Sequence, residues 1–173
     1  MSLLKAGIFQ SNGAGLNPAE RLASLAEAIA DQQLDLVVCP ELFMSGYNVG
    51  RHLHELAEPA DGPFAQSVAD LARQTGTAIC FGYPERNGET VYNSALLVSA
   101  TGAVLANHRK LAIPPGFEQG VFSPGDQLTG FVLSGMKCAL VIWYEVECPE
   151  TVRAAGMAGA ERGISPPARG AQW

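Results

Sequence analysis

Clustered positive charge is absent from this sequence. Its 173 residues include 11 Lys or Arg against 17 Asp or Glu, a formal net charge of −6, and the basic residues form no run. Proteins that bind nucleic acids or anionic membrane surfaces use patches of Lys and Arg for that purpose. The sequence therefore argues against both kinds of partner.

Long apolar runs are also missing. The N-terminal stretch MSLLKAGIFQSNG holds a short apolar run that is typical of a strand. It lacks the long apolar region and the small-residue cleavage site of a signal peptide. No apolar stretch is long enough to cross a bilayer. We therefore expect a cytoplasmic protein that does not enter the membrane.

Cysteine and histidine are few, and their spacing matches no metal site. The chain holds Cys39, Cys80, Cys138 and Cys148, and His52, His54 and His108. No C-x-x-C pair occurs, and no histidine lies at zinc-site spacing from a cysteine. Three of the cysteines fall in apolar runs, which favours buried free thiols over disulfides or metal ligands. Neither a metal ion nor another cofactor is predicted.

What is present is a chain rich in core-forming residues. Hydrophobic residues make up 47% and charged residues 16%, over a length that suits one domain. Apolar runs predict strands at 3–10, 34–41, 77–85, 90–100, 103–110, 128–134 and 137–143, and apolar stripes predict helices at 18–33, 63–75 and 149–160. This order predicts a mixed α/β fold with helices covering a sheet.

Several of these elements carry signals at their ends. Asn17 is suited to cap the first helix, with Pro18 at the first helical position and Glu20 where a capping-box acid lies. The second helix begins at a proline and is followed by a glycine, which is typical of helix ends. Asn87 and Gly88 predict a tight hairpin turn between 77–85 and 90–100.

The last residues break this pattern. After the helix at 149–160 an α/β order calls for a strand, but the chain continues ERGISPPARGAQW, with neither a helical nor a strand period. We therefore divide the chain into a domain at 1–160 and an irregular tail at 161–173. The tail is not expected to pack.

Three charged residues stand at positions suited to catalysis. Glu41 ends a strand that should be buried, where desolvation would raise its pKa and make it a general base; a solvated loop acid is an equal alternative. Lys110 ends another strand beside a Pro-rich loop and could stabilise an oxyanion, although a surface lysine is the commoner case. Glu118 lies in that loop, where a solvated acid is the default.

Four segments together resemble the nitrilase, or carbon–nitrogen hydrolase, superfamily, in an amidase-like form. They are VVCPELFMSGY, YNSA, HRKLAIPPGFEQGVFSPGD and LVIWYEVECPE, in the family's order. The resemblance implies a four-layer α-β-β-α sandwich. It implies that Glu41 is the general base, Lys110 the oxyanion-stabilising lysine and Glu118 a glutamate that positions groups in the site. It also implies a cysteine nucleophile at the end of the strand before Tyr144, whose backbone N–H would complete the oxyanion site.

The sequence departs from the family at that last position. Trp143 stands where the nucleophilic cysteine belongs, Glu145 replaces the usual Asp, and Cys148 lies five residues past the corner. An indole cannot act as a nucleophile, and its N–H is only a donor. The family chain also continues further, so we expect a sandwich incomplete at its C-terminus, and a shifted reading frame is a hypothesis for the tail.

Two functions remain open from the sequence. By resemblance, the chain is a carbon–nitrogen hydrolase acting on a small non-peptide amide or nitrile. The alternative, favoured by Trp143 and the tail, is a catalytically dead, truncated chain or a module that only binds or assembles. Family members commonly dimerise through the faces of the sandwich, so a homo-oligomer is also expected.

Overall fold

A computed structural model describes residues 3–10, 15–47, 49–50 and 52–167. The first part of the chain forms a five-stranded sheet in the order β1-β2-β3-β4-β5. Its elements are β1 (Ala6–Ile8), α1 (Pro18–Ile29), β2 (Leu36–Val38), α2 (His52–Leu56), α3 (Pro63–Thr75), β3 (Ala78–Asn87), β4 (Thr90–Val98) and β5 (Val104–Arg109). The first three strands are parallel, and β4 and β5 are added as antiparallel neighbours.

The second part forms a three-stranded sheet in the order β6-β7-β8. Its strands are β6 (Thr129–Leu133), β7 (Met136–Leu140) and β8 (Arg162–Ile164), and between the strands lie the short 3-10 turn η2 (Trp143–Glu147) and α4 (Pro149–Met157). Another 3-10 turn, η1 (Phe117–Gly120), lies in the loop between the two sheets.

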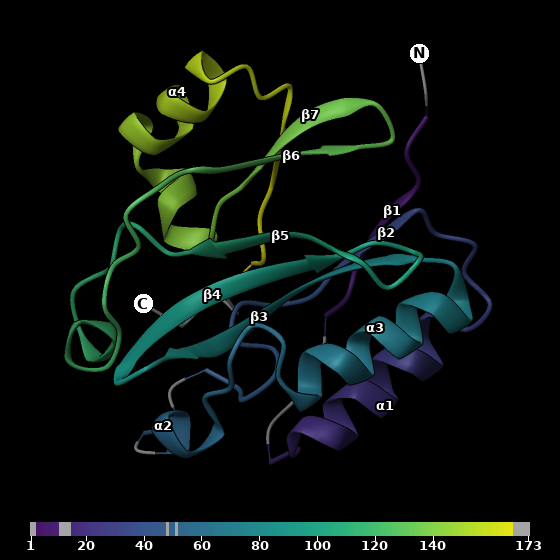
Figure 1. The fold of residues 1–173 in the computed structure, drawn as a ribbon, viewed down its shortest axis with the longest axis horizontal. Coiled ribbons are helices and arrows are strands. Elements are labelled where there is room, and N and C mark those ends of the chain that lie inside the picture. Colours follow the sequence, from purple (N-terminus) through teal and green to yellow (C-terminus); the bar gives the residue numbers. More distant parts are fainter. Residues whose placement is uncertain (1–2, 11–14, 48, 51, 168–173) are drawn as a thin grey trace.

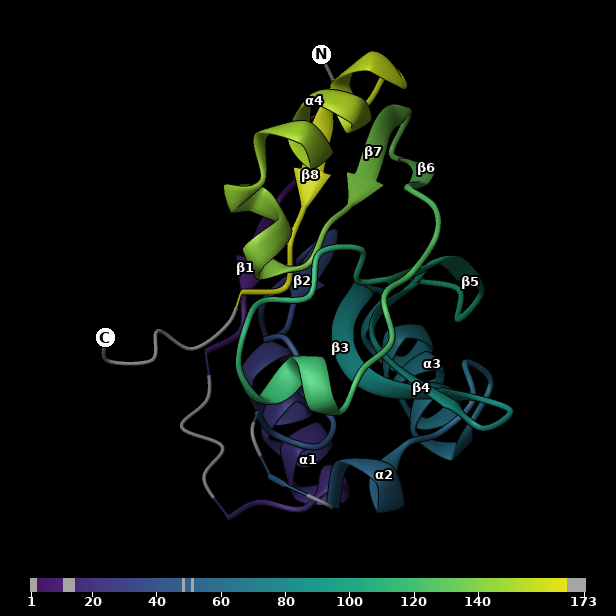
Figure 2. The same cartoon turned by 90° about the vertical axis from the view of Figure 1, so that its left-hand side faces the viewer.

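The elements stack in layers around two cores. Figure 2 shows α1 and α3 at one end, the five-stranded sheet in the middle, and β6–β8 with α4 at the other end. Alternate strand residues such as Val37 and Phe81 pack against α1 and α3. Their neighbours Val38 and Cys80 face the second sheet and pack with its Leu140. This period of two explains why the parallel strands read as continuous apolar runs, since both faces are covered.

The predicted mixed α/β architecture is confirmed, and α1 and α3 lie side by side on one face of the large sheet (Figure 1). Asn17 caps α1, with the reciprocal bond from Glu20 in place. The α1 helix is shorter than predicted: it ends at Ile29, because residues 30–33 add only exposed positions to its surface. A tight hairpin turn is also confirmed here, with Gly88 at φ 59°, but its turn residues are Gly88 and Glu89, because Asn87 still pairs with Thr90 as the last residue of β3.

The expectation of an irregular, unpacked segment from residue 161 onward is wrong for 162–164. These residues form β8, which pairs in parallel with β7, and Ile164 is buried between the sheets. Backbone pairing, with one buried side chain, holds the strand although Arg162 and Gly163 stay exposed. As a result β7 has a strand on each side, β6 and β8. Residues 168–173 lie outside the described part of the chain.

The predicted strand 137–143 is too long at its end. β7 stops at Leu140, and Trp143 begins the η2 turn. Over the residues that the structure describes, no helix has both the length and the apolar surface to cross a bilayer.

Candidate active site

Lys110 lies between two carboxylates in the interior of the molecule. Its Nζ donates to Glu41 Oε1 at 2.6 Å and to both carboxylate oxygens of Glu118 at 3.0 and 3.1 Å. The three side chains are almost fully buried. The structure thus brings together the three charged residues that the sequence singled out, and the readings of a solvated loop acid and a surface lysine are wrong.

Strand direction explains this convergence. β2 and β5 both run parallel to β3, so their carboxyl ends lie at the same edge of the sheet. Glu41 follows β2 and Lys110 directly follows β5. Glu118 reaches the same edge from η1. Side chains at the carboxyl edge of such a sheet commonly form binding sites.

Asn93 is a fourth member of the cluster. From β4 its Nδ2 donates to Glu41 Oε1 at 2.7 Å and to Glu118 Oε2 at 3.1 Å, and its backbone oxygen accepts from the N–H of Lys110 at 2.9 Å. Asn93 belongs to the YNSA segment that resembles the family, but the sequence alone indicates no role for it. The available signal was a polar amide inside an otherwise apolar strand, where it must find partners.

Tyr47 closes the outer side of the cluster. Its hydroxyl donates to Glu118 Oε1 at 2.8 Å, and its ring packs edge-on against Phe117 at 5.0 Å between centroids. Burial raises the pKa of the Tyr47 hydroxyl, and the bond to the Glu118 carboxylate raises it further. The phenol therefore stays a neutral hydrogen-bond donor.

Burial raises the pKa of Glu41, although the Lys110 ammonium opposes the shift. One oxygen, Oε1, holds the bonds from Lys110 and Asn93. The other, Oε2, has no hydrogen-bond partner within the described part of the chain. A carboxylate with a raised pKa and one free acceptor oxygen has the properties of a general base.

The raised pKa of Glu41 predicts how the free energy of unfolding changes with pH. An unfolded Glu41 ionises around its ordinary pKa of 4.5. The folded protein keeps the proton of Glu41 to a higher pH than the unfolded chain does. Glu41 therefore contributes its full stabilisation below the ordinary pKa, and this stabilisation is lost as the pH rises through the raised pKa. Urea unfolding from about pH 4 to 8 should show a fall with pH that Glu41→Gln reduces.

Glu85 provides a control of opposite sign. Burial raises its pKa, but bonds from Arg109, Ser94 and Asn107 outweigh burial and lower the pKa overall. Its contribution is therefore present above the ordinary value of 4.5 and is lost as pH falls through the lowered pKa. Equal pH slopes for Glu41→Gln and Glu85→Gln would contradict the assignment of a raised pKa to Glu41.

Gly82 allows the chain at Glu41 to lie against β3. A Cβ at Gly82 would lie 2.4 Å from the backbone nitrogen of Leu42 and 2.8 Å from Cα of Glu41. The two segments are joined by Gly82 N to Pro40 O at 3.3 Å and Met44 N to Gly82 O at 3.1 Å. The position of Glu41 therefore depends on a glycine in the middle of β3.

We expect Gly82→Ala to lower the free energy of unfolding by about 1–3 kcal/mol, because the new methyl group meets backbone atoms that cannot rotate away. The matched control is Gly156→Ala in α4, where an added Cβ meets nothing within 4 Å. That change should raise the stability by about 0.5–1 kcal/mol. Both values come from urea unfolding, and a Gly82→Ala protein as stable as its parent would refute the close approach.

The corner after β7 has a constrained backbone. Trp143 has a φ of 24°, which is costly for a residue with a Cβ. The first backbone bond of η2 runs from Glu145 N to Ile142 O at 2.9 Å. The N–H groups of Trp143 and Tyr144 precede that bond, as the first N–H groups of a helix do. They are therefore the groups at this corner that could bind a negatively charged oxygen.

A single carboxylate connects this corner to the lysine. Glu145 accepts from Leu111 N at 2.8 Å and from Ile142 N at 2.5 Å. Leu111 follows Lys110, and Ile142 precedes Trp143. The backbone at Trp143 therefore lies beside the strand end that carries Lys110.

The Cys148 thiol bonds back to the start of the η2 turn. Its Sγ lies 3.6 Å from the backbone oxygen of Tyr144, and Cys148 is the residue before α4.

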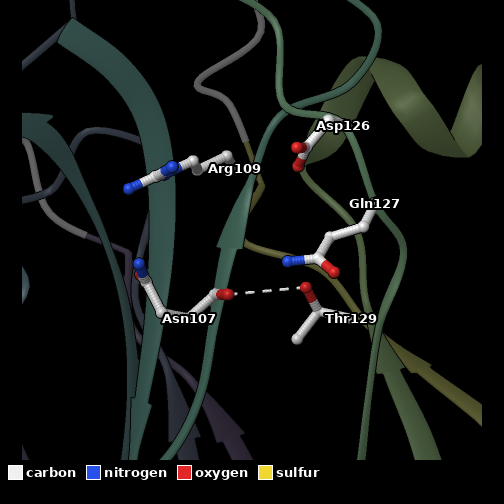
Figure 3. Close-up of a pocket in the computed structure, with 5 residues that line it drawn as sticks. All are labelled: Asn107, Arg109, Asp126, Gln127 and Thr129. Atoms are coloured by element: carbon white, nitrogen blue, oxygen red, sulfur yellow. Dashed lines mark hydrogen bonds between the residues drawn. The ribbon is translucent and has the colours of Figure 1, made fainter. Parts of the chain in front are cut away.

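A hollow of about 230 Å³ lies elsewhere, between β5 and the segment that leads to β6 (Figure 3). Thr129 Oγ1 donates across it to the backbone oxygen of Asn107 at 3.4 Å. Its lining residues are Asn107, Arg109, Asp126, Gln127 and Thr129. None of these belongs to the cluster around Lys110, so the hollow is separate from that cluster.

Comparisons with known proteins agree with one another. A family model described as carbon-nitrogen hydrolase matches residues 16–168. The chain is 38% identical over 169 residues to "Hydrolase in pqqF 5'region" of Pseudomonas protegens, covering 95% of this chain and 59% of that protein. It is 36% identical over 160 residues to an (R)-stereoselective amidase of Pseudomonas sp, covering 91% and 58%.

Solved structures show the same similarity. An amidase from Nesterenkonia sp. matches with a TM-score of 0.88 at 27% identity, covering 98% of this chain and 66% of that one. A mutant of the amidase from Nesterenkonia sp. AN1 shows the result of Michael addition of acrylamide at its active-site cysteine. The chain thus spans between 58% and 67% of the length of these proteins.

Proposed function

Because this chain belongs to the carbon-nitrogen hydrolase family, we propose that the cluster around Lys110 is an amidase-type centre for small non-peptide amides or nitriles. The observation that carries this proposal is the buried Lys110 ammonium, 2.6 Å from Glu41 and 3.0 Å from Glu118. A lysine fixed in this way keeps its charge at one point, where it can stabilise a developing oxyanion. The named relatives, two of which are amidases, support the substrate class.

Each residue of the site has its own role in the proposed reaction. In the family reaction a thiol loses its proton to a base while its sulfur bonds to the amide carbon, and the resulting oxyanion is held by donors. Here Glu41 would take that proton on its free Oε2, and Lys110 with the N–H of Tyr144 would hold the oxyanion. The C–N bond then breaks, and the leaving nitrogen takes from Glu41 the proton that came from the thiol, so that ammonia departs. Water then attacks the thioester and releases the acid and the free thiol. Glu118 keeps Lys110 and Asn93 in place.

Trp143 prevents the first step of this reaction, in which sulfur bonds to the amide carbon. It occupies the position of the thiol, and its indole N–H can donate a hydrogen bond but has no lone pair for attack. We therefore propose that this chain keeps the acid–base and oxyanion groups without the covalent step. Its present role is then binding or assembly, which was the alternative from the sequence, and cytoplasmic location and self-association stay predictions.

Ammonia release from a panel of small amides and nitriles tests the centre. A Trp143→Cys form, extended at its C-terminus with the matching part of a relative, should gain an activity that is lost on Glu41→Gln and on Lys110→Ala. Turnover by the chain with Trp143 in place, surviving both changes, would locate the chemistry elsewhere. Turnover by that chain which disappears on Cys148→Ala would assign the nucleophile to the Cys148 thiol.

A further inference from the structure

Glu145 is a fully buried carboxylate whose two oxygens hold two distant segments of the chain. Oε1 accepts from Leu111 N at 2.8 Å, and Oε2 accepts from Ile142 N at 2.5 Å. Oε2 also lies 3.0 Å from Nε2 of His108, which is itself fully buried. Hydrogen bonds to an ionised carboxylate are about twice as strong as neutral ones.

His108 extends this connection into the second sheet. Its other ring nitrogen, Nδ1, lies 3.1 Å from Thr129 Oγ1 at the start of β6. His108 is part of β5, two residues before Lys110. The histidine therefore joins β5, β6 and the carboxylate of η2, and its contact with Oε2 fixes the orientation of that carboxylate.

We propose that Glu145, oriented by His108, is a positioning residue for the oxyanion site. The proposal rests on the proposed function and deepens it. The carboxylate holds the residue after Lys110 and the residue before Trp143 at the same time. It thereby sets the separation between the Lys110 ammonium and the N–H of Tyr144, the two groups assigned to the oxyanion. Glu145 itself touches neither substrate nor reacting atoms.

A first test uses the fluorescence of Trp143. The chain has two tryptophans, so Trp173→Phe leaves Trp143 as the sole reporter of the corner. Glu145→Gln keeps the size of the side chain but turns one acceptor into a donor that faces a backbone N–H. We expect this variant to be quenched more strongly by acrylamide than its parent.

The matched control is Glu161→Gln. Glu161 also accepts a backbone N–H, from Lys137 at 2.9 Å, but at an exposed position by β7 and β8. This variant should leave the quenching of Trp143 unchanged. Equal quenching of Trp143 in Glu145→Gln and Glu161→Gln would overturn the proposal.

A second test measures whether the backbone at position 143 keeps its place relative to Lys110. In a Trp143→Cys form, the introduced thiol is alkylated with iodoacetamide across a range of pH, which reports its thiolate fraction. With Glu145→Gln added, the profile should shift up by about one pH unit, an alkylation about tenfold slower near neutral pH, because a displaced lysine no longer stabilises the thiolate. A purely structural role would lower the melting temperature without moving this profile, and that result would overturn the proposal.

His108→Gln supplies a second variant where Glu145→Gln prevents folding. It removes the ring but keeps both backbone bonds to the carboxylate, so quenching and alkylation should change in the same direction by less. Unchanged readouts in a folded His108→Gln protein would overturn the proposal. Neither measurement uses amide turnover. A failure of the proposed function would instead appear as a Trp143→Cys thiol that is alkylated as in the unfolded chain.

Discussion

Replacing Trp143 with Cys is expected to give the largest gain of activity of any single substitution, once the chain is extended by the C-terminal part of a relative. Removal of a covalent nucleophile from a hydrolase costs about 10⁶-fold in turnover, while binding and oxyanion donors alone keep a small residual rate. Glu41 and Lys110, which we propose as base and oxyanion donor, are in direct contact. In the extended chain, the return of a thiol should therefore raise ammonia release by at least about 10⁴-fold.

The measurement is a two-by-two comparison on one amide panel. Trp143 and Trp143→Cys are each tested in this chain and in this chain extended by the C-terminal portion of the Pseudomonas protegens relative, whose length it covers to 59%. We expect turnover only where the thiol and the extension are combined, because pocket walls must orient the substrate. Turnover by the extended form that still carries Trp143 would refute the assignment of position 143.

Replacing Lys110 with Met should give the largest loss of stability. The ammonium is fully buried, and Glu41 and Glu118 both depend on it. Breaking a buried ion pair by removing one partner costs about 3–5 kcal/mol, because the other charge stays uncompensated. Urea unfolding of Lys110→Met should show a loss of this size, whereas Lys137→Met, at an exposed position of β7, should change stability by less than about 0.5 kcal/mol.

A triple variant separates this cause from simple loss of packing. Adding Glu41→Gln and Glu118→Gln to Lys110→Met removes both orphaned charges, and neutral replacements of a buried ion cluster are often close to neutral in stability. We therefore expect most of the lost stability to return. A triple variant as unstable as Lys110→Met would show that the fit of the lysine side chain, and not its charge, stabilises the fold.

The sequence marks Glu41 and Lys110 because each stands at the end of an apolar run, and the family resemblance implies that they act together. The strand order of the structure explains why they meet at one sheet edge. Asn93 lies inside β4 and Glu145 inside η2, so neither stands at a strand end, and the sequence does not reveal their partners 52 and 34 residues away. Such pairings depend on packing between elements, which no local period encodes.

The same reason explains why β8 was not predicted and why β7 was predicted too long. β8 is a strand of three residues with one buried side chain, too short to show a period. Its pairing with β7 supplies the hydrogen bonds that its composition does not predict. β7 ends before Trp143 because the chain turns there into η2, where the carboxylate of Glu145 takes over the N–H of Ile142. In the sequence the apolar run continues from Leu140 to Trp143, so the sequence does not mark the end of β7.

The ion cluster also has a consequence for the order of folding. Its bonds close loops of 69 residues between Glu41 and Lys110 and of 52 residues between Glu41 and Asn93. The β3–β4 hairpin closes over a short turn and can form early, whereas contacts between distant residues form late. Until the contacts between distant residues form, Lys110, Glu41 and Glu118 stay hydrated. These three groups therefore lose their water in the last step of folding. In stopped-flow refolding, we therefore expect Lys110→Met to accelerate unfolding and to leave the folding rate nearly unchanged.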